Sequence, residues 1–98
     1  MYLLNAFSVQ MVRDALLKNG KVTVEFSLVD SIPTQELESA VGHADTAAVL
    51  GVPMNRINVK LNPGDEAYLA QLNGGRLPEG STTLPEGFSF DKVKVRVD

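Results

Sequence analysis

Apolar and polar residues alternate along several segments of the chain, and this alternation predicts β-strands. Residues 21–28, 56–61 and 92–97 alternate with a period of two, which places every second side chain on the same face of a sheet. Residues 2–7 form a short apolar run suited to a buried strand, and residues 66–72 supply a further strand. The pattern therefore predicts a sheet of about five strands.

Turn and capping residues separate these strands. A helix over residues 9–17 is expected to begin after Ser8, a residue type that caps helices, and to end at Asn19-Gly20. Residues 62–65, with the sequence Asn-Pro-Gly-Asp, have typical turn chemistry, and the glycine-rich residues 73–80 form a loop.

Two further short helices are expected over residues 31–41 and 43–50, separated by Gly42. Proline suits the first turn of the former, whose inner face comprises Leu37, Ala40 and Val41. The chain shows no repeat and no flexible linker. We therefore expect residues 1–98 to form one α/β domain, with a mixed sheet flanked by short helices.

Length and composition narrow the class of protein. A chain of 98 residues buries only about 60–65% of its extended surface, and with 0 Cys and 1 His it has neither disulfides nor a structural zinc site to reinforce it. A homodimer would bury more surface. No apolar run approaches the roughly 18 residues of a membrane span, and the N-terminal residues do not resemble a signal peptide. We expect a cytoplasmic protein without membrane contact.

The charge balance argues against binding to duplex nucleic acid. The chain has 9 basic and 12 acidic residues, a net charge of −3, whereas proteins that bind long nucleic acids by counterion release show a basic excess. A small anionic ligand is still compatible, because two or three arginines in the right place are enough to hold it.

Motifs for common chemistries are absent. There is no phosphate-binding P-loop, no dinucleotide fingerprint and no nucleophile elbow. The sequence predicts no metal and no cofactor, since zinc would lack ligands and the acidic residues are scattered. A Ser-His-Asp triad depends on placement in space, which the sequence leaves open.

The single histidine, His43, stands directly after a glycine at a predicted helix start. Backbone N–H groups there favour anions, and a bound phosphate would favour the imidazolium form. The alternative is a structural histidine. Arg76 lies in the glycine-rich loop, three residues before Glu79, and is either a phosphate contact or half of a solvated ion pair. Arg56 is either a ligand contact or an edge charge, and Asn5 either satisfies backbone or faces a polar site.

Four segments, taken together and in this order, resemble a known family. They are Tyr2-Leu3-Leu4-Asn5-Ala6-Phe7-Ser8, Val41-Gly42-His43-Ala44-Asp45-Thr46, Asn55-Arg56-Ile57-Asn58-Val59-Lys60-Leu61, and Tyr68-Leu69-Ala70-Gln71 running into Gly75-Arg76-Leu77-Pro78-Glu79-Gly80. The chain is similar to the viral type III anti-CRISPR ring nucleases, which have relatives in phages, mobile elements and some CRISPR loci. That family was formerly catalogued as a domain of unknown function.

The resemblance implies an activity. The family's enzymes are homodimers that degrade cyclic tetra-adenylate, the second messenger that activates CRISPR ancillary nucleases. The resemblance further implies that His43 is the general acid, that Glu79 lies near the reacting centre, and that the ligand is bound by Asn5, Ser8, Arg56, Gln71 and Arg76.

The implied chemistry agrees with the residues at hand. The substrate supplies the nucleophile itself, the ribose 2′-hydroxyl next to the phosphate. One general acid and a few arginines therefore suffice for cleavage, without a metal. Two other functions stay open: a protein that sequesters a cyclic oligonucleotide without cleaving it, and a DNA-binding regulatory protein of a virus or mobile element.

Overall fold

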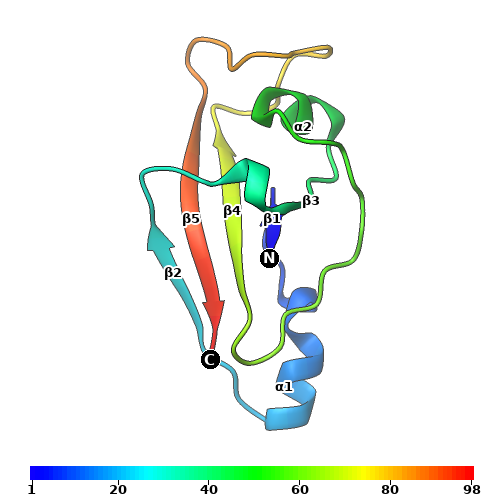
Figure 1. Cartoon of the computed structure of the whole chain (residues 1–98), viewed down its shortest axis with the longest axis vertical. Coiled ribbons are helices and arrows are strands. Elements are labelled where there is room, and N and C mark those ends of the chain that lie inside the picture. Colours follow the sequence, from blue (N-terminus) through cyan, green and yellow to red (C-terminus); the bar gives the residue numbers. More distant parts are fainter.

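The computed structural model describes residues 1–98. Its elements are β1 (Tyr2–Leu4), the 3-10 turn η1 (Val9–Met11), α1 (Arg13–Asn19), β2 (Val24–Leu28), the 3-10 turn η2 (Thr34–Glu36), β3 (Glu38–Ala40), α2 (Ala44–Leu50), β4 (Glu66–Asn73) and β5 (Ser89–Val97). The strands form one five-stranded sheet in the order β2-β5-β4-β1-β3 (Figure 1). β1 runs parallel to both β3 and β4, whereas β5 is antiparallel to β4 and β2. The prediction of a mixed α/β sheet with short helices is confirmed.

The two helices cover opposite faces of the sheet. Side chains alternate along each strand, so neighbouring leucines of β1 enter different clusters, Leu4 on one face and Leu3 on the other. The first face packs against Val12 and Leu16 of the α1 region, and the second against Ala47 and Leu50 of α2. In Figure 1, α1 and α2 lie near opposite ends of the long axis.

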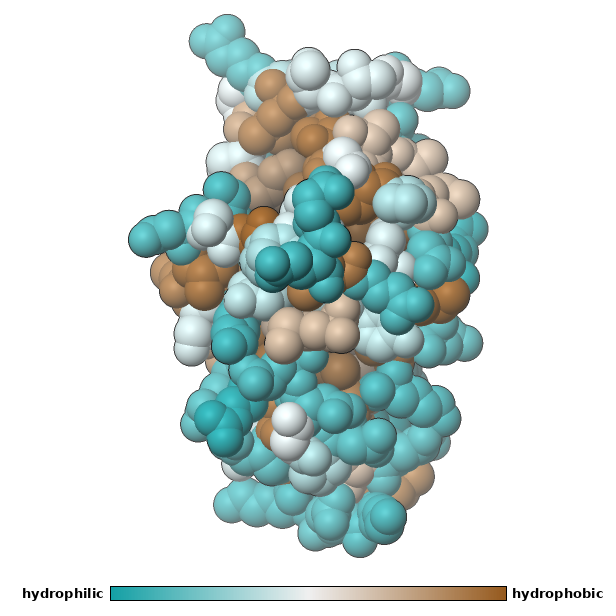
Figure 2. Space-filling model, in the orientation of Figure 1, coloured by the Kyte–Doolittle hydropathy of each residue, from teal (hydrophilic) through white to brown (hydrophobic).

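The face that carries α2 is uneven in character. Figure 2 shows hydrophobic atoms gathered mainly in its upper half and hydrophilic atoms over most of its lower half. The α2 side contains the buried cluster of Leu3, Val41, Ala47 and Ala70. Beyond it, β4 and β5 present a surface ion pair in which Lys94 Nζ lies 2.9 Å from Glu66 Oε2.

No helix of the structure combines the length and hydrophobicity needed to cross a lipid bilayer.

The predicted helix over residues 31–41 is wrong. Only the 3-10 turn η2 is helical there, and β3 follows it and pairs with β1. Helical spacing assigned Leu37, Ala40 and Val41 to one face, but in the extended chain Leu37 and Val41 pack into one cluster and Ala40 into the other. Apolar residues spaced three or four positions apart are compatible with a helix and with an extended strand. The pairing of residues 38–40 with the buried strand β1 favours the strand.

The predicted strand over residues 56–61 is also wrong, although the segment buries the expected side chains. Val59 and Leu61 are buried in the cluster under α1, and the Leu61 amide donates to the Met11 carbonyl oxygen at 2.7 Å. The segment pairs with no strand of the sheet. Alternation of apolar and polar residues indicates that an extended segment buries one face. It does not indicate whether the segment also forms hydrogen bonds with a neighbouring strand.

The helix expected over residues 9–17 is divided into η1 and α1, with Val12 as the junction. Gly20 ends α1 in the left-handed conformation, with φ of 73°, and its amide donates to the Leu16 carbonyl oxygen. The predicted capping glycine is therefore confirmed. Ser8 precedes η1 but makes no capping hydrogen bond through its side chain.

Candidate functional site

Parallel pairing brings several candidate residues to one end of the sheet. Because β1, β3 and β4 run in the same direction, their carboxyl ends meet at a single edge. Asn5 follows β1, Gly42 and His43 follow β3, and the loop that contains Arg76 follows β4. The sheet thereby gathers segments that are far apart in the sequence.

Gly42 is held from both sides of its backbone. Asn5 Oδ1 accepts a hydrogen bond from the Gly42 amide at 3.4 Å. Arg56 donates to the Gly42 carbonyl oxygen from Nε at 3.1 Å and from Nη2 at 2.9 Å. A Cβ atom at Gly42 would lie 3.4 Å from Arg56 Cγ, which is van der Waals contact, so the arginine side chain packs directly against this glycine. These contacts fix the backbone immediately before His43.

His43 caps the N-terminus of α2. It has extended backbone dihedrals, and its Nδ1 accepts a hydrogen bond from the Thr46 amide at 3.4 Å. With Nδ1 as an acceptor, the proton of the neutral ring sits on Nε2. When the ring takes a second proton, Nδ1 becomes a donor, and Thr46 Oγ1 lies at 3.4 Å to accept it. The surroundings can therefore accommodate both forms of the ring.

The loop after β4 packs beside the first turn of α2. Leu77 is buried, with 4% of its surface exposed, and anchors the loop to the domain. The Gly80 amide donates to Asp45 Oδ1 at 3.2 Å. The side chains of Arg76 and Glu79 are exposed and do not pair with each other, so the solvated ion pair considered above does not form. Both are free to contact a ligand.

Asn5 and Gln71 line one cavity of about 400 Å³. The rest of its lining is apolar: Ala6, Phe7, Phe26, Leu69 and Val93. The rings of Phe7 and Phe26 meet edge to face, with centroids 5.3 Å apart. A cavity lined mainly by apolar side chains, with two amide side chains among them, has the composition typical of a small-molecule site.

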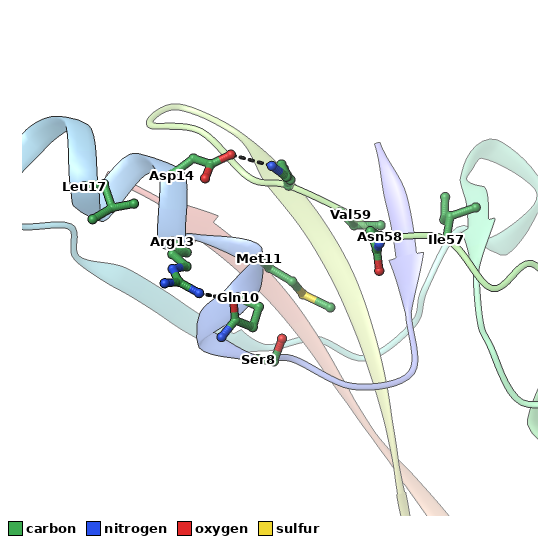
Figure 3. A pocket seen from close by; sticks show the side chains of 10 residues that line it. Ser8, Gln10, Met11, Arg13, Asp14, Leu17, Ile57, Asn58 and Val59 are labelled. Carbon is green, nitrogen blue, oxygen red and sulfur yellow. Dashed lines mark hydrogen bonds and ion pairs between the residues drawn. The ribbon is translucent and has the colours of Figure 1, made fainter.

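Ser8 lies apart from the other candidates. It lines a different cavity, of about 650 Å³, between the α1 region and residues 57–60 (Figure 3). Lys60 and Asp14, which both line this cavity, form an ion pair in which Lys60 Nζ lies 2.6 Å from Asp14 Oδ2. The reason for the separation is that β1 ends at Leu4 rather than Phe7, so the chain leaves the sheet before Ser8.

Sequence reasoning missed Thr46, whose amide donates to His43, and Asp45, which accepts from the Gly80 amide next to Glu79. The signal for Thr46 was its position three residues after the helix cap, where an N3 residue commonly interacts with the cap. Asn55 was also missed: its Nδ2 donates to the Ser39 carbonyl oxygen at 2.8 Å and so ties the Arg56 segment to β3. No group of three or more His, Cys, Asp or Glu side chains has a metal-binding arrangement.

Comparison with known proteins identifies the family of the chain. The sequence matches the STIV B116-like family over residues 1–92. The chain belongs to the STIV B116-like family. The structure of this STIV B116-like protein is similar to that of B116 of Sulfolobus turreted icosahedral virus (STIV), with a TM-score of 0.70, 25% sequence identity and 97% of each chain covered. No curated protein matches the sequence. The similarity extends over nearly the whole chain and links it to a viral protein.

Proposed function

We propose that this STIV B116-like protein is a metal-independent ring nuclease that cleaves cyclic tetra-adenylate. Its products are linear oligoadenylates that end in a 2′,3′-cyclic phosphate, and their formation ends type III CRISPR signalling. The observation that carries the proposal is the setting of His43: it follows a backbone held by Arg56 and Asn5 and lies in the helical turn to which the Glu79 loop is docked.

The reaction requires alignment and one proton donor. The ribose 2′-oxygen attacks the adjacent phosphorus, the new 2′-O–P bond forms, and the P–5′-O bond breaks. Alignment of the attacking oxygen converts this into an intramolecular displacement. His43 in its imidazolium form donates a proton to the departing 5′-oxygen and so acts as the general acid. The 2′-hydroxyl proton passes to solvent or to Glu79.

Cationic groups are needed for the phosphates. Arg76 has no partner in the protein, and Arg56 uses Nε and Nη2 for Gly42 but leaves Nη1 uncommitted. Arginine stabilises the extra charge of the phosphorane through charge-assisted hydrogen bonds. The cavity lined by Asn5 and Gln71 suits an adenine, because an amide can bond to N6 and N7 of that base together.

The proposal includes a homodimer. A ring of four nucleotides is too large for one chain of 98 residues to enclose, and it presents twofold symmetry. A C2 dimer offers the same patch twice, so two copies of His43 would face opposite phosphodiesters.

Incubation of the purified protein with cyclic tetra-adenylate in EDTA tests the proposal. Linear products that carry a 2′,3′-cyclic phosphate, identified by mass spectrometry, are expected. A ring that stays intact with excess protein, while binding is measurable, would instead favour sequestration. A salt-dependent shift of duplex DNA at sub-micromolar protein would favour a DNA-binding regulator, which the net charge of −3 argues against.

A further inference from the structure

Asp45 connects two parts of the molecule that the sheet alone leaves independent. It occupies the second position of α2, two residues after His43, and its Oδ1 accepts from the Gly80 amide at 3.2 Å. An acidic residue in a first helical turn ordinarily interacts with the helix's own amides. Here its hydrogen-bond donor comes from a loop 35 residues away in the sequence.

The segment that Asp45 binds is a tight turn with Glu79 at its tip. The Ser81 amide donates to the Pro78 carbonyl oxygen at 3.2 Å, which closes the turn, and the Ser81 hydroxyl donates to the same oxygen at 2.6 Å. Gly80 has φ of 79°, as the third position of a type II turn requires. Its amide points out of the turn toward Asp45, so the hydrogen bond holds the turn that carries Glu79.

The loop is fixed at only a few other places. At its base, Gly74 approaches Gly87 so closely that a Cβ would lie 2.8 Å from the Gly87 carbonyl oxygen. Leu77 is buried between base and tip. Beyond Leu77, the Gly80–Asp45 hydrogen bond is the contact that sets where Glu79 lies relative to α2.

We propose that Asp45 is a positioning residue: it latches the Pro78–Ser81 turn onto the first turn of α2 and thereby holds Glu79 and Arg76 at a defined place beside His43. The inference deepens the proposed function and rests on it for its catalytic consequence. The latch itself is a property of the unliganded protein.

Hydrogen exchange of the Gly80 amide, followed by NMR without nucleotide, tests the latch. In Asp45→Ala this amide should exchange about tenfold faster, because its acceptor is lost. Asp45→Asn keeps an acceptor oxygen at the same position and should retain most of the protection. Asp65→Ala is the matched control, since Asp65 Oδ2 accepts from the Asn62 amide at 2.8 Å in a turn at the opposite end of β4. Equal Gly80 exchange in wild type and Asp45→Ala would overturn the latch.

Cleavage of cyclic tetra-adenylate tests the catalytic consequence. Asp45→Ala should slow single-turnover cleavage by about tenfold to 100-fold, since small misplacements of reacting groups have effects of this size, and Asp45→Asn should restore most of the rate. The same substitution is then made in a chain that already carries Arg76→Ala and Glu79→Ala. If Asp45 acts only through these two residues, Asp45→Ala should not reduce the cleavage rate of that chain further. A purely structural role would instead give additive losses of rate. Additive losses, or failure of Asn to rescue, would overturn the positioning role. Absence of cleavage by wild type would contradict the proposed function, while the exchange result would still decide whether the latch exists.

Discussion

Arg56 donates two hydrogen bonds to a single atom, the carbonyl oxygen of Gly42, at 3.1 and 2.9 Å. Gly42 precedes His43, and its amide is in turn held by Asn5 Oδ1. The guanidinium fork therefore fixes the backbone from which the candidate acid projects. Arg56, for which the family resemblance implies a ligand contact, is thus a structural support of the site.

Arg56→Ala should lower the free energy of unfolding by about 1 kcal/mol, below the 1.5–3 kcal/mol typical of hydrogen bonds to charged groups, because the side chain is exposed. Arg56→Lys should recover little of this loss, since an ammonium group cannot reproduce the two-pronged contact. Urea denaturation measures both variants. Arg13→Ala is the control, because Arg13 makes a single exposed contact to Gln10. Equal stabilities of Arg56→Ala and Arg13→Ala would contradict the supporting role.

Two neighbouring glycines should respond differently to alanine. Both have positive φ, 112° at Gly74 and 97° at Gly75, so either substitution introduces backbone strain of about 1–3 kcal/mol. At Gly74 the new Cβ would also meet the Gly87 carbonyl oxygen at 2.8 Å and Phe88 at 3.0 Å, whereas at Gly75 it would meet nothing. Thermal unfolding should therefore show Gly74→Ala as the less stable variant. A smaller loss at Gly74 than at Gly75 would show that the loop base is less tightly closed than in the structure.

The Lys94–Glu66 pair should contribute to stability in a pH-dependent way. The hydrogen bond from Lys94 to Glu66, and then the charge of Glu66, raise the pKa of Lys94 above 10.5. A raised lysine pKa stabilises the folded state below the ordinary pKa, and this contribution is lost as pH rises through the folded value. The stability difference between wild type and Glu66→Gln should be constant near neutral pH and shrink above pH 10.5. A difference that grows with alkaline pH would contradict this sign.

Arg76→Ala should weaken the binding of cyclic tetra-adenylate about tenfold, because a charge-assisted contact to phosphate is lost. Calorimetry in a His43→Asn background would measure the affinity without turnover. Arg13→Ala removes the same charge at the cavity between the α1 region and residues 57–60 and should leave the affinity unchanged. If the Arg76→Ala and Arg13→Ala variants bind cyclic tetra-adenylate equally well, Arg76 is a loop residue that does not contact the ligand.

The sequence correctly predicted those elements whose residue pattern is compatible with only one type of secondary structure. The α2 helix, the 62–65 turn and the two long strands lie where alternation, capping residues and turn residues indicated. Residues 31–41 and 56–61 were mispredicted because their apolar spacing suits two structures, and the choice depends on which segment β1 pairs with. Pairing partners are a property of the whole fold.

The candidate site shows the same division. His43 and Arg76 stood out because of residue type and neighbouring glycines, and the structure puts their segments at the same end of the sheet. Ser8 was grouped with them only through the family resemblance, and the early end of β1 separates it from Asn5. Asp45 acts through a contact across the fold, which no local pattern reports, whereas the contact between Thr46 and His43 is local to the helix cap.

Single-turnover cleavage of cyclic tetra-adenylate in EDTA by wild type and by His43→Asn tests the central claim most directly. Asparagine is itself a good helix cap and keeps an acceptor for the Thr46 amide, but it cannot act as an acid. The account predicts that His43→Asn binds the ring with nearly unchanged affinity and cleaves it at least about 100-fold more slowly. Cleavage at the wild-type rate would contradict the assignment of His43 as the general acid.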